Sequence, residues 1–146
     1  MTNILFIDMD KEKIKINPWF VHALLSPLAG YADIDVDGVD EYRNVDPNDE
    51  VTMKKIIREV FLPFYKNRNT PEFCEKMKNS LKFYLSTNSF NWERKFNSCL
   101  LPFDHPDNPR DFFVWIWEEW CPNERYQISN VSDYYVNDDI NELQMY

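Results

Sequence analysis

Glycine is nearly absent from this sequence of 146 residues, which contains only Gly30 and Gly38. Glycine supplies the positive φ angles and the close backbone approach on which phosphate-binding loops depend. The scarcity of glycine therefore argues against P-loop and dinucleotide-binding folds. It also argues against a fold built from many tight β-turns.

Long hydrophobic runs and targeting signals are also missing. The apolar run nearest the start, Ile4 to Ile7, is short and follows no basic residue, so it does not resemble a signal peptide. No stretch approaches the roughly 18 consecutive apolar residues of a membrane span. We therefore expect no interaction with a membrane.

Cysteine is present, but not in a pattern that predicts disulfides or a metal site. Cys74, Cys99 and Cys121 are odd in number, far apart and form no CxxC motif. Reduced thiols are typical of cytosolic proteins, so the sequence predicts a cytoplasmic location. All three cysteines lie on apolar segments, where a buried and unreactive thiol is the usual state.

Histidine is equally scarce, which limits the chemistry that can be expected. Neither His22 nor His105 has a cysteine or histidine at metal-ligand spacing, so we expect no metal and no cofactor. A Cys–His nucleophile pair could arise only between residues distant in sequence, and no local motif indicates one. The sequence therefore predicts a protein without catalytic activity.

What the sequence does contain is enough apolar material for a single domain spanning residues 1–146. Hydrophobic residues make up 44% of the chain and aromatic residues 16%. A chain of this length buries roughly 70% of the surface that its unfolded form exposes. Neither a repeat nor a long linker divides it.

Local patterns predict an α+β fold with a helical majority and a few short strands. Asn17-Pro18, Asp46-Pro47 and Thr70-Pro71-Glu72 are typical helix starts. Further helical periodicity covers about 89–100, and we expect Pro63 to end or kink the helix that begins near Asp46. Four segments have strand-like patterns: 3–8 and 13–16, which would form a hairpin, 31–38, and 134–136.

The segment 109–121 remains ambiguous between helix and strand. Asn108, Pro109 and Asp111 form a helix start, with asparagine as the N-cap. The following run from Phe112 to Trp117 is instead rich in residues that favour strands. The capping residues favour the helix.

Charge is divided unevenly along the chain, whose formal net charge is −9. Residues 1–50 carry a net −7, residues 51–100 a net +6, and residues 101–146 a net −8. A net negative charge disfavours direct binding of nucleic acid, because phosphates are met by lysine and arginine. It favours a basic protein partner.

Two acidic clusters are the candidate partner-binding residues. The first, Asp33, Asp35, Asp37, Asp40 and Glu41, begins like an EF-hand calcium loop. Such a loop needs a bidentate glutamate at its twelfth position, where this chain has asparagine, so we expect an acidic strand and no calcium site. The second cluster consists of Glu118 and Glu119, which lie between Trp117 and Trp120, a combination typical of interface hot spots.

In size and acidity, and in lacking a catalytic motif or targeting signal, this chain resembles bacterial immunity proteins of contact-dependent growth inhibition and related polymorphic toxin systems. The resemblance covers the whole chain as an overall profile and transfers no individual residue. It implies an inhibitor that binds the C-terminal domain of a cognate toxin, often a nuclease. The basic middle third departs from a purely acidic inhibitor, and lysines on the same side as the acids would make the interface mixed in charge.

Three other functions and one mode of assembly remain open. A nucleic-acid mimic would array its carboxylates along one continuous face. An enzyme would need a cleft that joins His22, a cysteine and an acid. Direct nucleic-acid binding would need the lysines of 54–82 on one face. The oligomeric state is also open, including a homodimer through the aromatic C-terminal third.

Overall fold

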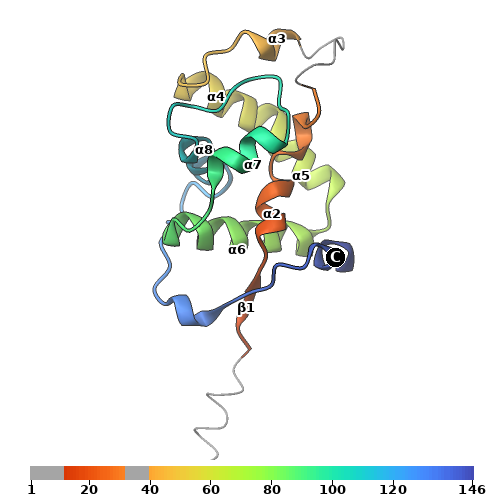
Figure 1. The fold of residues 1–146 in the computed structure, drawn as a ribbon, viewed down its shortest axis with the longest axis vertical. Helices are drawn as coiled ribbons and strands as arrows, with labels where there is room; N and C mark the ends of the chain where they lie inside the picture. The colour runs from red at the N-terminus through yellow and green to blue at the C-terminus, as the bar shows by residue number, and fades with distance from the viewer. Residues whose placement is uncertain (1–11, 32–39) are drawn as a thin grey trace, which may run out of the picture.

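The computed structural model describes residues 12–31 and 40–146, which form helices packed on one another with a small two-stranded sheet at one end (Figure 1). The α-helices are α2 (Pro18–Ala23), α3 (Asp40–Arg43), α4 (Glu50–Ile56), α5 (Leu62–Arg68), α6 (Pro71–Thr87), α7 (Trp92–Ser98) and α8 (Arg110–Trp120). The other elements are 3-10 helices η1 (Ser26–Leu28), η3 (Val131–Asp133) and η4 (Ile140–Met145), π-helix η2 (Ile57–Phe61), and strands β1 (Ile14–Ile16) and β2 (Tyr134–Val136). The predicted α+β class with a helical majority is confirmed.

The sheet joins the two ends of the described chain. β1 and β2 are parallel, with Ile14 opposite Tyr134 and Ile16 opposite Val136. The strand predicted at 134–136 is therefore confirmed, and β1 confirms most of the strand predicted at 13–16. The strand predicted at 3–8 lies outside the described residues, and so does the strand predicted at 31–38 except for Tyr31.

The predicted helix starts at Asn17 and Thr70 are confirmed and the one at Asp46 is wrong. α8 begins one residue later than predicted, with Pro109 in place of Asn108 at the N-cap position. The side chains of Asn17 and Thr70 accept hydrogen bonds from backbone N–H groups at the starts of α2 and α6. Asp46 does not cap α4, because its carboxylate accepts from the N–H of Asn48 and closes a turn. Asp49 is the N-cap instead, and its hydrogen bonds with Thr52 lower the pKa of its carboxyl.

Pro63 neither ends nor interrupts the helical path. Proline lacks the N–H that an α-helix needs, and the chain adjusts just before it by forming the π-turn η2. There the N–H of Leu62 donates to the carbonyl of Ile57, five residues back. α4, η2 and α5 therefore follow one another directly. Val51 is 79% exposed in the first turn of α4.

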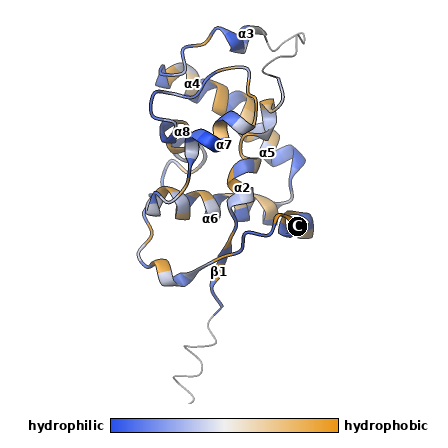
Figure 2. Ribbon diagram, viewed as in Figure 1, coloured by the Kyte–Doolittle hydropathy of each residue, from blue (hydrophilic) through white to orange (hydrophobic). Residues whose placement is uncertain are grey.

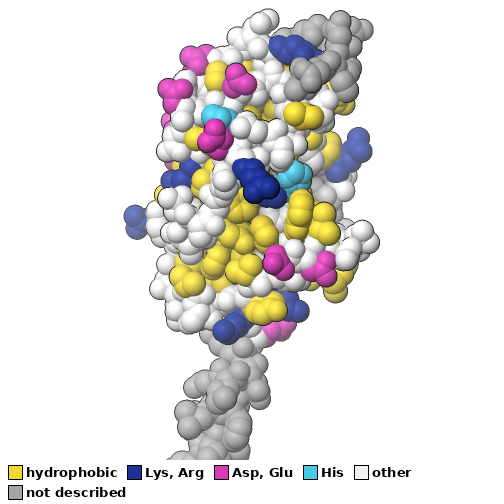
Figure 3. All heavy atoms as spheres, viewed as in Figure 1, with side chains coloured by type: hydrophobic (Ala, Val, Ile, Leu, Met, Phe, Trp, Pro, Cys, Tyr) yellow, Lys and Arg dark blue, Asp and Glu magenta, His cyan; other side chains and the backbone are white. Residues whose placement is uncertain are grey.

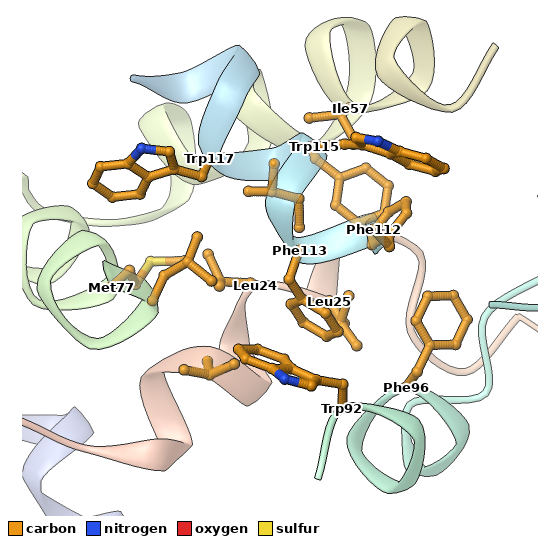
Figure 4. Packing of buried hydrophobic residues seen from close by; sticks show 14 of the residues in the cluster. Leu24, Leu25, Ile57, Met77, Trp92, Phe96, Phe112, Phe113, Trp115 and Trp117 are labelled. Carbon is orange, nitrogen blue, oxygen red and sulfur yellow. The ribbon is translucent and has the colours of Figure 1, made fainter. Parts of the chain in front are cut away.

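The core is built around α8 (Figure 4). Because α8 covers Arg110–Trp120, the segment 109–121, which the sequence left ambiguous, is helical. Phe112 and Phe113 are fully buried. The Phe112 ring packs edge to face against Phe61 and Phe96, each at a centroid distance of 5.5 Å. Figure 2 shows hydrophobic residues along the packed helices and mainly hydrophilic residues in α7.

The C-terminal segment docks on the junction between β1 and α2 through a buried polar network. Asn17 is fully buried, and its amide nitrogen donates to the carbonyl of Asp139 (2.8 Å) and to the carboxylate of Glu142 (3.1 Å). Its backbone N–H donates to Ser80 Oγ at 3.0 Å. One side chain thus caps α2 and also holds the end of the chain, which passes beneath α6 (Figure 1).

Among the described helices, none is long and apolar enough to cross a lipid bilayer.

Candidate functional site

The second predicted acidic cluster lies at the C-terminal end of α8, opposite two cations of α4 and η2. Glu118 Oε1 lies 3.2 Å from Lys54 Nζ, and Glu119 forms an ion pair with Arg58. Lys54 also pairs with Glu50 at 3.1 Å. Burial alone would lower the pKa of the Lys54 ammonium, but hydrogen bonds to Glu50 and Glu118 outweigh it and raise that pKa. The two carboxylates therefore belong to a surface of alternating charge.

Trp120 completes this surface as a partly buried aromatic anchor. Its ring packs on Tyr65 at a centroid distance of 4.9 Å, and Lys78 Nζ lies 5.1 Å from the ring centre. Tyr65 is itself buried and donates its hydroxyl hydrogen bond to the carbonyl of Leu24. Because burial raises the pKa of Tyr65 well above its usual range, this hydroxyl stays protonated. We call Lys54, Arg58, Glu118, Glu119 and Trp120 the α8 surface.

A pocket of about 930 Å³ opens beside the α8 surface, between η2, α5, α6 and the end of α8. Its walls combine apolar and polar side chains: Arg58, Leu62, Pro63, Lys66, Asn67, Asn69, Pro71, Cys74, Glu75, Lys78 and Trp120. Cys74 contributes a half-buried thiol whose pKa is raised by burial, against an opposing effect of Lys78. That thiol is therefore protonated at neutral pH and is not a reactive thiolate.

The first acidic cluster is only partly described. Asp33, Asp35 and Asp37 lie outside the described residues. Asp40 is the first residue of α3 and Glu41 is exposed on that helix. Glu41 lies near Thr52 and Lys55 of α4, with which it lines a small pocket.

Glu41 of the first cluster and Glu118 of the second therefore both lie near α4, beside different residues of that helix. Glu118 pairs with Lys54 of α4, whereas Glu41 lies beside Thr52 and Lys55. Charges of both signs are also interspersed on the face seen in Figure 3, with hydrophobic side chains exposed between them. Basic residues of the middle third thus lie among acidic residues, which gives a surface of mixed charge.

A Cys–His pair, which the sequence could not indicate, forms between α2 and the end of α7. Cys99 Sγ lies 3.6 Å from Nδ1 and 3.8 Å from Nε2 of His22. Burial raises the pKa of the Cys99 thiol, while burial and the nearby Lys95 ammonium lower the pKa of His22. Both groups are therefore neutral at pH 7, the opposite of the thiolate–imidazolium pair of a cysteine nucleophile.

The lowered pKa of His22 predicts a loss of stability on mild acidification. In the unfolded chain the pKa of His22 returns to its ordinary value of 6.5. As the pH falls below 6.5, His22 is therefore protonated in the unfolded chain before it is protonated in the folded one, which favours unfolding. We expect the free energy of unfolding, measured by urea denaturation, to decline between about pH 7 and pH 5. The decline should be shallower in His22→Gln. Equal slopes for the two proteins would contradict this assignment.

The pocket could not be found from the sequence, because its cations come from separate helices. Lys66 lies in α5 and Lys78 in α6, and each resembles any solvated lysine on an amphipathic helix. Of the pocket residues, Trp120 alone had a sequence pattern that indicated a function, since a tryptophan beside two carboxylates is typical of an interface.

Within the described ranges, no group of three or more His, Cys, Asp or Glu side chains could hold a metal ion. No protein-family model, curated protein or solved structure matches this chain.

Proposed function

We propose that this chain is a cytoplasmic inhibitor that binds and neutralises a cognate toxin domain by protein–protein contact, as immunity proteins do, without catalysis of its own. The observation that carries the proposal is the α8 surface, where an aromatic anchor lies among exposed charges of both signs. A nuclease domain, as the resemblance to immunity proteins implies, is the expected target.

The composition of the α8 surface fits that of known binding hot spots. Tryptophan and arginine dominate the binding energy of many interfaces, and surrounding charges select the partner and speed association. Trp120 is held in place by Tyr65, so little side-chain freedom is lost when a partner covers it. The partner should therefore present both basic and acidic groups to this surface.

The ion pairs of the α8 surface count against a nucleic-acid mimic. A mimic needs a continuous array of carboxylates free to replace phosphates, whereas Glu118 and Glu119 each have a cation beside them. The neutral state of Cys99 and His22 likewise gives no support to a thiol enzyme. These observations favour inhibition through binding.

Co-expression tests the proposed function in cells. The C-terminal domain encoded by the neighbouring upstream gene is expressed from an inducible promoter, with or without this chain. We expect growth to stop without this chain and to continue with it. A domain that is toxic in both cases would overturn the proposal for that pair.

Charge reversal at the end of α8 should weaken inhibition without unfolding the protein. Glu118 and Glu119 form surface ion pairs, which contribute about 0–1 kcal/mol to stability. In the double variant Glu118→Lys, Glu119→Lys we expect the affinity for the toxin domain to fall by roughly 100-fold, since like charges would face the partner's cations. The melting temperature should change little.

The control for this variant is Glu93→Lys on α7. Glu93 is also an exposed glutamate beside a basic side chain, since its carboxylate lies 3.8 Å from His105. We expect Glu93→Lys to bind the toxin domain as tightly as the parent protein. If both variants bound equally well, the α8 surface would not be the binding surface.

A further inference from the structure

The pocket beside the α8 surface has a local charge opposite to that of the protein. Arg58, Lys66 and Lys78 line it, against the single carboxylate of Glu75. The whole chain carries a net charge of −9. A concave site in which one sign of charge predominates attracts ligands of the opposite sign.

Two of these cations, Lys66 and Lys78, differ from the other lysines of this region in their ion pairs. Among the residues that the structure describes, no carboxylate oxygen forms an ion pair with Lys66 or Lys78, whereas Lys54 and Lys82 each have one or more. Lys78 lies instead over the Trp120 ring. The pocket therefore presents two ammonium groups that form no ion pair with a carboxylate in the described part of the chain.

The rest of the pocket is suited to an apolar side chain next to the anion. Leu62, Pro63 and Pro71 line it together with the Trp120 ring and the neutral thiol of Cys74. A volume of about 930 Å³ is at the upper end of the range for small-molecule sites, which is enough for a few amino-acid side chains. Carboxylate and apolar groups can thus be accommodated together.

We propose that this pocket binds a short acidic segment of the partner protein, with carboxylate side chains at Lys66 and Lys78 and an apolar or aromatic side chain against Trp120. The inference rests on the proposed function, because it takes the natural ligand to be part of the inhibited protein. A peptide is favoured over a nucleic acid, since a long polyanion is repelled by the net negative charge while a short segment meets only the local cations.

The test uses a peptide probe and the full chain. The probe is acetyl-Glu-Asp-Phe-Asp-Glu-amide, titrated at low salt while the indole N–H resonances are followed by NMR, with Trp120 assigned from Trp120→Phe. We expect a saturable shift of the Trp120 resonance. The double variant Lys66→Gln, Lys78→Gln should weaken binding roughly tenfold, since it removes both unpaired charges.

The matched control is Lys55→Gln, Lys76→Gln. It removes the same total charge from the same part of the chain, and Lys76 also lies over an aromatic ring, that of Tyr146. Neither residue lines the pocket. We expect this control to bind the probe within about twofold of the parent protein, which is the scale of a screened long-range charge effect.

Three outcomes would overturn the pocket assignment: no saturable shift at Trp120, equal binding of the neutral peptide acetyl-Gln-Asn-Phe-Asn-Gln-amide, or a stronger shift with pentathymidylate. Because the probe needs no partner, these results are separate from the proposed function. If the toxin domain bound the parent protein and the Lys66→Gln, Lys78→Gln variant equally, only the pocket would be excluded. If it bound neither, the proposed function would fail whatever the probe showed.

Discussion

Phe112→Ala is expected to lower the free energy of unfolding by about 3–5 kcal/mol, the cost of removing a buried phenyl ring and leaving a cavity. Phe112 is fully buried and lies where four aromatic rings meet, from η2, α7, the loop after α7, and α8 itself. The rings that border the space are rigid, so we expect it to collapse only in part. Urea denaturation followed by tryptophan fluorescence measures the loss.

Val51→Ala is the control for this substitution. Val51 is 79% exposed on α4, so truncation removes little buried surface and alanine is the better helix former. We expect a change within about 0.5 kcal/mol. If Phe112→Ala cost no more than Val51→Ala, α8 would not be the centre of the core.

Asn17→Ala is expected to cost about 3 kcal/mol, because it removes more than a helix cap. The cap alone contributes about 1 kcal/mol, and a hydrogen bond to a charged group about 1.5–3 kcal/mol. Asn17 supplies both, together with the bond to the carbonyl of Asp139. Alanine would also leave Glu142, which is 4% exposed, with fewer donors.

The comparison variant is Asn91→Ala, which removes the exposed N-cap of α7 and leaves the hydrogen bonds of Asn17 intact. We expect it to cost about 1 kcal/mol. Limited proteolysis should cleave within 137–146 faster in Asn17→Ala than in Asn91→Ala, since only the first substitution releases the C-terminal segment. Equal costs and equal cleavage would show that Asn17 acts as an ordinary cap.

Local features of this fold were predictable from the sequence because their chemistry is local. Asn17 and Thr70 precede prolines at the first helical position, and both cap the helices that follow. The choice of helix for 109–121 followed from Asn108, whose side chain accepts from the N–H of Arg110. The prediction that Asp46 caps a helix was wrong because Asp49, three residues later, can accept the same kind of hydrogen bond. Asp46 begins a turn and Asp49 begins the helix.

Features that depend on distant contacts were not predictable. β1 pairs with β2 across 120 residues of sequence, and no pattern in either strand specifies a parallel partner. Helix packing likewise brings His22 to Cys99. It also brings Lys66, Lys78 and Trp120 to one pocket. Glu118 and Glu119 were identified as candidates from neighbouring tryptophans, but their pairing with Lys54 and Arg58 needed the structure.

Isothermal titration calorimetry tests the central claim most directly. This chain is titrated against the C-terminal domain encoded by the upstream neighbouring gene, at low and at moderate salt. We predict tight one-to-one binding that weakens as salt increases, and that weakens further in Glu118→Lys, Glu119→Lys but not in Glu93→Lys. The absence of binding heat at either salt concentration, with both proteins folded, would contradict the assignment of this chain as an inhibitor of that domain.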